Sequence, residues 1–222
     1  MLSGDIGIQR YSGNNPISGA DNAPQNPLYG RVQVETVPAV EPVTVDEMNS
    51  FLKLNGEAQN DYVRGLIVAA RQACETYTGV KFVTQTLNAW YDRIPYDSTL
   101  KLLYGPCQSI TSVTTYASDG TATVFDEDSY FKDIISSSPR IILVDGQTWP
   151  VNTRSYNAVR VVYVVGYGLA ANVPEAIKTA IKLVVAAIFE TPGEIKKTKI
   201  NVNEYMTEGI KFMLTPYTKV SL

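Results

Sequence analysis

The sequence predicts an α+β fold: mainly a helical bundle, built from a short capped helix, two long helices and a C-terminal segment, with a small antiparallel β-rich part. Two windows, 60–78 and 174–190, repeat apolar residues with the period of an α-helix. Between them, residues 80–168 are rich in β-branched and aromatic residues separated by turn dipeptides. The 222 residues are 45% hydrophobic and 18% charged, and no run approaches the roughly 18 apolar residues of a membrane span. We therefore expect a globular body with no membrane partner.

Residues 1–40 show the apolar repeat of neither a helix nor a strand. Glycine, proline, asparagine and serine dominate this stretch, so it has no apolar face to bury. We interpret it as an extended arm, which is either a floppy terminus or a segment that orders only against a neighbouring subunit. Val32, Val34 and Val37 predict a short strand near its end. The first residues lack the basic and apolar regions of a secretory signal, so we expect synthesis in the cytoplasm.

The first helix is expected at residues 45–54. Thr44 and Glu47 have the spacing of a capping box, in which each side chain satisfies a free backbone N–H of the first turn. Asn55-Gly56 is expected to stop this helix because both residues favour turns.

The second helix is expected at residues 60–78, and Gly79 suits the left-handed conformation just beyond its end. Arg64, Arg71 and Glu75 lie off its apolar stripe, which is the face predicted to be buried. The stripe consists of Val63, Leu66, Ile67, Ala70, Cys74 and Tyr77.

Turn signals divide the β-rich part into short strands. Ser118-Asp119-Gly120 and Asp145-Gly146 are typical of hairpin turns. The last strand, at residues 158–165, carries valine on both faces, which predicts a central strand that is covered on both sides. The strands are expected at 83–93, 99–103, 109–117, 121–125, 140–144 and 158–165.

The last long helix begins at Pro174-Glu175, since proline and an acidic residue suit a first turn, and it ends before Thr191. Residues 183–189 are apolar almost all round, so this helix needs cover on a second side, from the subunit's own core or from a neighbouring subunit. A weakly amphipathic segment from Tyr205 to Leu214 is too short to be stable alone, and we expect it to order on a partner. The expected divisions are an arm at 1–40, a main domain at 41–192 and a docking tail at 193–222.

The composition excludes several classes of catalytic and metal site. The sequence has no histidine, which excludes histidine-based triads, HExxH sites and histidine-ligated zinc. Cys74 and Cys107 are too few for a disulfide framework, and we expect two free, buried thiols. Gly166-Tyr167-Gly168 lacks the rest of a dinucleotide-binding fingerprint, and the acidic residues 126–128 lack the pattern of a calcium-binding loop. We therefore expect no cofactor. The net charge of −3 also disfavours a protein that grips DNA.

Several motifs follow one another in a distinctive order. They are Tyr77-Thr78-Gly79, Gly105-Pro106, Asp119-Gly120, Trp149-Pro150, Val159-Arg160-Val161, Val165-Gly166-Tyr167 and Val173-Pro174-Glu175-Ala176-Ile177. This order resembles the head-tail connector (adaptor) proteins of tailed bacteriophages over about residues 44–190. In addition, Gly209-Ile210 through Leu214, Pro216 and Tyr217 is similar to the C-terminal ending of that family.

The resemblance implies a structural virion protein of the neck, made in the host cytoplasm, and no enzymatic activity. Its subunits are expected to form a homo-oligomeric ring of twelve, which joins the head to the tail and extends the DNA channel. The implied partners are the portal protein and the next tail or head-completion component, while genomic DNA passes through without sequence-specific binding. The segment implied to bind the portal contains Lys196, Lys197, Lys199, Tyr205, Met206, Ile210, Phe212, Met213, Leu214 and Tyr217.

Two other functions stay open from the residues alone. The chain has 14 tyrosines, which suit a binding module of a phage tail that recognises carbohydrate or a receptor, because tyrosine combines a large ring with a polar tip. A hydrolase that uses two carboxylates is also open, since the distance between them depends on the folded structure.

Overall fold

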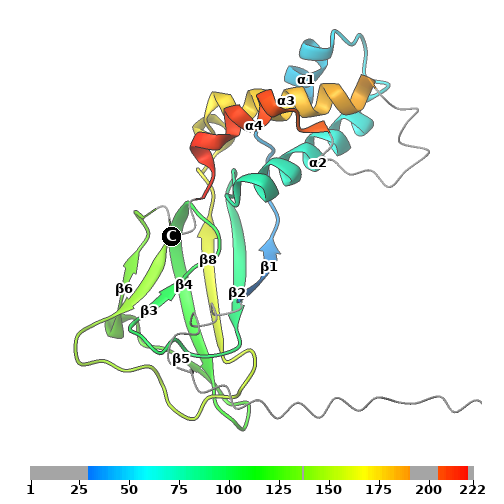
Figure 1. The fold of residues 1–222 in the computed structure, drawn as a ribbon. Helices are drawn as coiled ribbons and strands as arrows, with labels where there is room; N and C mark the ends of the chain where they lie inside the picture. The colour runs from blue at the N-terminus through cyan, green and yellow to red at the C-terminus, as the bar shows by residue number, and fades with distance from the viewer. Residues whose placement is uncertain (1–29, 137, 191–204, 220–222) are drawn as a thin grey trace, which may run out of the picture.

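The computed structural model describes residues 30–136, 138–190 and 205–219, which form a helical layer at one end of a β-rich part (Figure 1). The expected arm lies outside the described residues as far as residue 29. In the described ranges the α-helices are α1 (Val45–Leu52), α2 (Asn60–Thr78), α3 (Glu175–Glu190) and α4 (Glu208–Leu214). The strands are β1 (Gly30–Thr36), β2 (Gln85–Tyr91), β3 (Thr99–Lys101), β4 (Cys107–Tyr116), β5 (Ala122–Val124), β6 (Tyr130–Asp133), β7 (Arg140–Leu143) and β8 (Val159–Val165).

The strands form two antiparallel sheets that share one core. The larger sheet has the order β1-β2-β8-β4-β5, and the smaller sheet has the order β3-β7-β6. An α+β fold is therefore confirmed, but its description as mainly a helical bundle is wrong, because the strands are substantial and bury a core of their own. The sequence does not predict β6, since Tyr130-Phe131 is followed by two charged residues instead of a continued apolar alternation.

Local signals set the boundaries of α1 and α2. The capping box is confirmed: Thr44 Oγ1 accepts from the backbone N–H of Glu47 (3.1 Å), and Glu47 Oε2 accepts from the backbone N–H of Thr44 (2.8 Å). This second hydrogen bond lowers the pKa of Glu47. Helix α1 ends earlier than expected because Lys53 takes the left-handed conformation, with φ 56°. Helix α2 has the predicted bounds, and Gly79 closes it at φ 67°.

Strand β8 occupies the centre of the larger sheet, with β2 on one side and β4 on the other. Its residues alternate between buried and half-buried along the whole strand, so only one of its faces points into the core. The prediction of cover on both sides is wrong, because Val162 and Val164 lie on the face that no described element covers.

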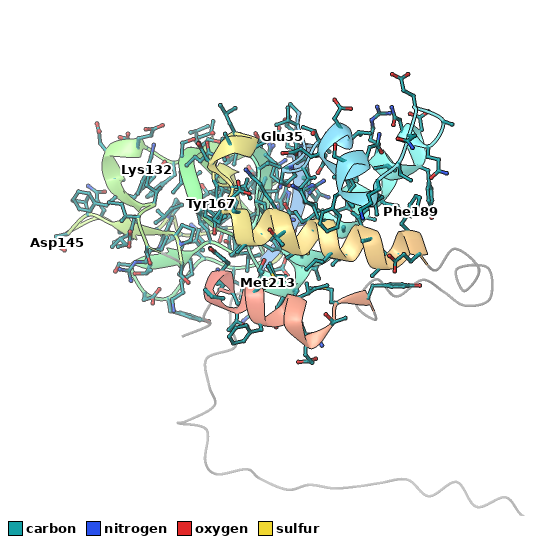
Figure 2. All side chains as sticks on the ribbon, turned by 90° about the horizontal axis from the view of Figure 1, so that it is seen from above. Glu35, Lys132, Asp145, Tyr167, Phe189 and Met213 are labelled. Atoms are coloured by element: carbon teal, nitrogen blue, oxygen red, sulfur yellow. The ribbon has the colours of Figure 1, made fainter. Side chains whose placement is uncertain are left out.

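Helix α3 lies between α4 on one side and α1 and α2 on the other (Figure 2). Ile177, Ile181 and Val184 are fully buried in the helical core, which also receives residues of α2 and α4. The subunit itself therefore supplies the second side of cover that residues 183–189 require.

The junction between α2 and the larger sheet is built around the carboxylate of Glu75, which is 1% exposed. Its Oε1 accepts hydrogen bonds from the backbone N–H of Phe82 (3.1 Å) and from the side-chain amide of Gln85 (3.3 Å). Its Oε2 pairs with Arg71 (3.2 Å) and Lys81 (3.0 Å). A buried charge is tolerated only when it is paired and hydrogen-bonded in this way.

Arg71 extends this network to the chain that enters the helical layer. Its Nε donates to Glu41 at 2.6 Å, and its side chain is buried beside Glu75. Burial alone would lower the pKa of Arg71, but the hydrogen bond to Glu41 and the charge of Glu75 outweigh it and raise the pKa. The sequence places Arg71 and Glu75 off the apolar stripe of α2, yet both are buried, because each finds an opposite charge inside the junction.

The segment from α2 to β2 and the segment from β8 to α3 both connect the helical layer to the larger sheet, and they are hydrogen-bonded to each other. The N–H of Tyr167 donates to the carbonyl of Phe82 (3.0 Å), and the N–H of Thr84 donates to the carbonyl of Gly168 (3.1 Å). Gly166 has φ +110°, and a Cβ there would collide with the backbone of Val83. Only glycine therefore allows the two segments to approach this closely.

Replacing Glu75 with alanine should lower the free energy of unfolding by about 3–5 kcal/mol, because buried Arg71 keeps only Glu41, half-buried Lys81 loses its carboxylate, and the backbone N–H of Phe82 loses its acceptor. Denaturant unfolding followed by circular dichroism measures the change. The matched control is Glu57→Ala, which removes an exposed carboxylate just before α2 and should change stability by less than about 0.5 kcal/mol. Equal effects of the two substitutions would contradict the role of the network.

Both cysteines are free and buried, Cys74 in the helical core and Cys107 in the core between the sheets. Burial and the charge of Glu75 raise the pKa of Cys74 to about 12, and burial raises the pKa of Cys107 to about 11. At pH 8 almost no reactive thiolate is present, so a thiol reagent should label the native protein slowly. After unfolding without reductant, two thiols per chain should react at once. A mass two hydrogens lower, with no thiol, would contradict this expectation.

Candidate interaction surfaces

The C-terminal segment packs against α3 within the same subunit. Helix α4 runs beside α3, and Met213 is labelled on it in Figure 2. Ile210 and Leu214 are four residues apart on one face of α4, and Met206 lies just before the helix. All three are buried in the helical core. The expectation that these three side chains anchor a partner is therefore corrected: they belong to the core of the subunit.

Lys219 ties this segment to the β-rich part. Its backbone N–H donates to the carbonyl of Thr78 (2.8 Å), and its Nζ donates to the carbonyls of Leu102 and Leu103 (2.9 Å each). Burial, together with the charge of Lys101, lowers the pKa of Lys219. The C-terminal segment thus holds the helical layer and the β-rich part together.

The other residues expected to contact the portal are only partly available. Phe212 is 80% exposed on the outer side of α4. Tyr205, Met213 and Tyr217 are half-buried. The three lysines Lys196, Lys197 and Lys199 lie outside the described residues.

A second surface lies at the opposite end of the molecule, where the loops after β2 and β4 and before β8 gather (Figure 1). Trp149 donates its indole N–H to the carbonyl of Asp97 (3.1 Å), which joins two of these loops. Tyr96 is 90% exposed there, and Val151 and Tyr156 also project into solvent. Exposed tyrosines beside apolar residues are typical of protein-binding surfaces. We call this surface the loop end.

The larger sheet has an open face, which we define by Trp90, Tyr116, Val124, Val162 and Val164 with the arginines Arg31, Arg154 and Arg160. The rings of Trp90 and Tyr116 stack with centroids 5.6 Å apart. The guanidinium of Arg160 lies 5.5 Å from the Trp90 ring, and that of Arg154 lies 4.1 Å from the Tyr116 ring. The sequence shows these residues only as scattered aromatic and basic positions, and pairing of β2, β8 and β4 brings them together.

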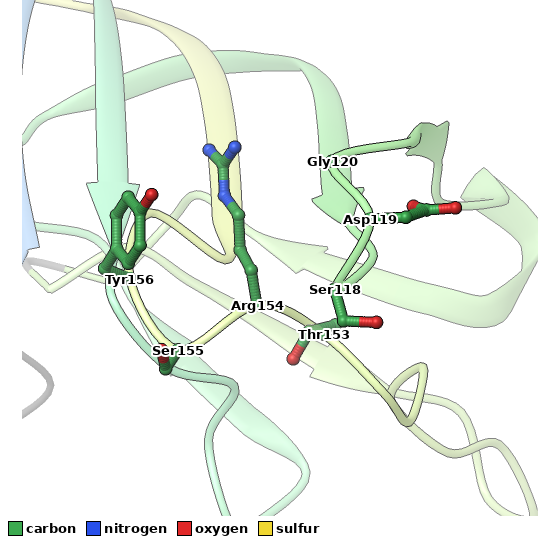
Figure 3. Close-up of a pocket in the computed structure, with 7 residues that line it drawn as sticks. All are labelled: Ser118, Asp119, Gly120, Thr153, Arg154, Ser155 and Tyr156. Carbon is green, nitrogen blue, oxygen red and sulfur yellow. The ribbon is translucent and has the colours of Figure 1, made fainter.

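Arg154 also lines a concave surface of about 500 Å³ next to the hairpin turn at residues 118–120 (Figure 3). Its Nε donates to the carbonyl of Asn157 (2.8 Å). The carboxylate of Asp119 accepts from the N–H of Thr121 (2.8 Å) and is turned away from Arg154 (Figure 3). The concavity therefore has one cation, Arg154, one carboxylate that points away from it, Asp119, and neutral hydroxyl groups.

The smaller sheet has an outer face on the opposite side of the shared core. Thr99, Ile142 and Phe131 are paired in one row across it, and Phe131 is 64% exposed. Ile135, just after β6, is 98% exposed. The acidic turn at residues 126–128 borders β6 and is exposed.

The described residues contain no helix long and apolar enough to cross a membrane. In the same part of the chain, no three Asp, Glu or Cys side chains come together in a way that could hold a metal ion.

No protein-family model matches the chain, and no curated protein sequence matches it. Solved structures do. A chain from the neck of an empty GTA particle, computed with C6 symmetry, aligns with 86% of this chain and 97% of its own length, with a TM-score of 0.69 and 16% identity. A chain from the virion of a native gene transfer agent (GTA) particle gives the same TM-score and identity over 96% of its length. A chain from the neck of a native GTA particle, computed with C12 symmetry, gives a TM-score of 0.63 and 18% identity. At these identities the likeness establishes a shared fold.

The burial of α4 generates a direct test. Leu214→Ala should lower the free energy of unfolding by about 2–5 kcal/mol, since it opens a cavity in the helical core. Phe212→Ala, two positions away on the exposed side of the same helix, should change it by less than about 0.5 kcal/mol. Denaturant titration of both variants measures the difference. A neutral Leu214→Ala would mean that the segment does not contribute to the fold.

Proposed function

We propose that this protein is a structural subunit of the neck of a phage-like particle, where it forms a homo-oligomeric ring between head and tail. The observation that carries the proposal is the shared fold, which extends over 97% of a chain from a GTA neck. The order of sequence motifs supports the same assignment by a separate route. The C6 and C12 symmetries of those neck structures support a ring, and we propose twelve subunits.

The two-ended construction of the subunit supports a joining role. The helical layer and the loop end lie at opposite ends of one continuous β-rich part (Figure 1). The buried network at Glu75 and the contacts of Lys219 connect the helical layer to the β-rich part. A subunit of this kind can hold two different components apart, one at each end.

We place the portal contact at the helical end. Phe212 is the large exposed hydrophobic side chain of α4, and half-buried Tyr217 follows that helix. The lysines at 196, 197 and 199 belong to the same proposed docking tail, 193–222. The loop end, with Tyr96 and Tyr156, is then available to the next tail or head-completion component.

The proposed role requires neither a catalytic site nor a DNA-binding surface. DNA would pass along the ring axis, and a subunit with net charge −3 offers little general attraction for its phosphates. The concavity at Arg154 lacks a paired acid and base, which favours a structural role over a carboxylate hydrolase.

A second candidate is a binding module of a phage tail that recognises carbohydrate or a receptor. The loop end favours it, because Tyr156 and Arg154 lie next to each other beside the concavity. Position in the particle separates the two functions: a neck subunit lies between head and tail in fixed stoichiometry, whereas a receptor-binding module lies at the tail tip.

The proposed portal contact can be measured with the full chain and the portal protein of the same particle, by determining the affinity with light scattering or interferometry. Phe212→Ala should weaken binding roughly tenfold or more while leaving the fold unchanged, as expected for a central anchor. The matched control is Tyr96→Ala, an equally exposed aromatic side chain at the other end, which should bind portal normally. Absence of portal binding by the wild type, or gold label at the tail tip, would contradict the proposed function.

A further inference from the structure

We infer that copies of this chain pack side by side, with the open face of the larger sheet of one subunit against the outer face of the smaller sheet of the next. The inference rests on the proposed function, because it names the surfaces that would close the ring. It concerns the described part of the chain, in which both faces lack a covering element.

The position of the two faces favours head-to-tail packing. They lie on opposite sides of one shared core, since the larger sheet and the smaller sheet bury their inner faces against each other. A ring requires two different complementary surfaces on each subunit, because identical surfaces that meet each other close a dimer. Opposite faces satisfy this requirement, and they leave the helical end and the loop end free for axial partners.

The open face is large enough to form the centre of such an interface. Strands β1, β2 and β8 have seven residues each, β4 has ten and β5 has three. At about 3.3 Å along a strand and about 4.8 Å between strands, the sheet covers about 540 Å², against about 800 Å² per partner in a standard interface. Its middle carries Val162 and Val164, and Val124 on the edge strand is largely exposed. The valines and the Trp90–Tyr116 pair are set among polar side chains and arginines, and this mixed composition is typical of interfaces between subunits that fold separately.

The outer face of the smaller sheet offers matching chemistry. Phe131 projects from it, and Ile135 is exposed in the turn that follows β6. An aromatic ring is suited to the space between two packed sheets. No other described element contacts Ile135, which is almost fully exposed, so folding of the single subunit does not explain it.

Charges at the margins of the two faces are complementary. Within the described residues, Arg154 forms no salt bridge, and Arg160 has only a long one, to Glu35 at 3.6 Å. The acidic turn at residues 126–128 connects the edge strand β5 of the larger sheet to the edge strand β6 of the smaller sheet, so it borders the outer face at that edge. Asp128 has no salt bridge in the described part of the chain. Val124 pairs with Thr114, which pairs with Arg160, so the turn begins near the level of Arg160 along the strands. Side-by-side copies therefore bring these opposite charges together.

Two charge-introducing variants of the full chain test the packing. Val162→Glu blocks the open face, and Phe131→Glu blocks the outer face. Val124→Glu, on the exposed edge of the open face, replaces Val162→Glu if the latter fails to fold by circular dichroism. The matched control is Phe212→Glu, the same type of change on α4, outside both faces.

Sedimentation velocity over a series of increasing concentrations gives the outcome. Wild type and Phe212→Glu should associate with rising concentration, and each face variant alone should stay monomeric. An equimolar mixture of the two face variants should form a heterodimer and nothing larger, because one intact pair of faces remains. Association of either face variant alone, including dimerisation of Phe131→Glu through two open faces, would overturn the inference. A wild type that stays monomeric throughout would also overturn it.

Portal binding separates this inference from the proposed function. Val162→Glu should keep the portal affinity of a single wild-type subunit, because Phe212 is unchanged, while losing self-association. If wild type and variants all fail to bind portal, the proposed function fails, and the heterodimer result still decides how copies of this chain pack.

Discussion

A buried carboxylate must be paired wherever a chain folds around it, and here that carboxylate is Glu75. Its partners come from α2 itself, from the crossing to β2 and from β2, so the helix and the sheet cannot separate without leaving charges unpaired. Arg71 is itself a buried charge, and it also pairs with Glu41, on the segment that leads from β1 into α1. The position of the helical layer on the β-rich part is therefore set by electrostatic satisfaction as much as by apolar contact.

The C-terminal segment adds a second, independent connection between the layers. Leu214 fills the helical core, while Lys219 reaches the carbonyls of Leu102 and Leu103 at the top of the β-rich part. The two connections involve different residues, so separating the layers would break both the ion pairs of Glu75 and the hydrogen bonds of Lys219. The proposed role as a joint would use this double connection, because such a subunit must hold its two ends apart.

Local patterns in the sequence predict most of the helices and strands. They do not predict features that depend on contacts between residues far apart in the chain. The helix at 60–78 and its stop at Gly79 follow from apolar period and glycine chemistry within one stretch of chain. The burial of Arg71 and Glu75 does not, because it depends on Lys81 and Glu41, which reach the site only after the layers dock. For the same reason, the apolar positions of α4 identify a buried face but not what covers it: α3 of the same subunit has the matching surface. The open face likewise exists only after β2, β8 and β4 have paired.

Polar and charged groups are distributed over the open face and reduce the apolar surface that the single chain exposes there. The open face alternates valine with threonine, serine and asparagine, and its aromatic rings are covered by Arg154 and Arg160, whose stems shield apolar surface while their charges stay hydrated. Folding is completed by Glu75 and Leu214 inside the single chain, so association need not contribute to the fold. An interface that does not have to stabilise the fold of the subunit can be weak. In the proposed ring each copy would use both faces at once, and closure adds contacts without further loss of freedom, so weak pairwise packing is compatible with a stable ring.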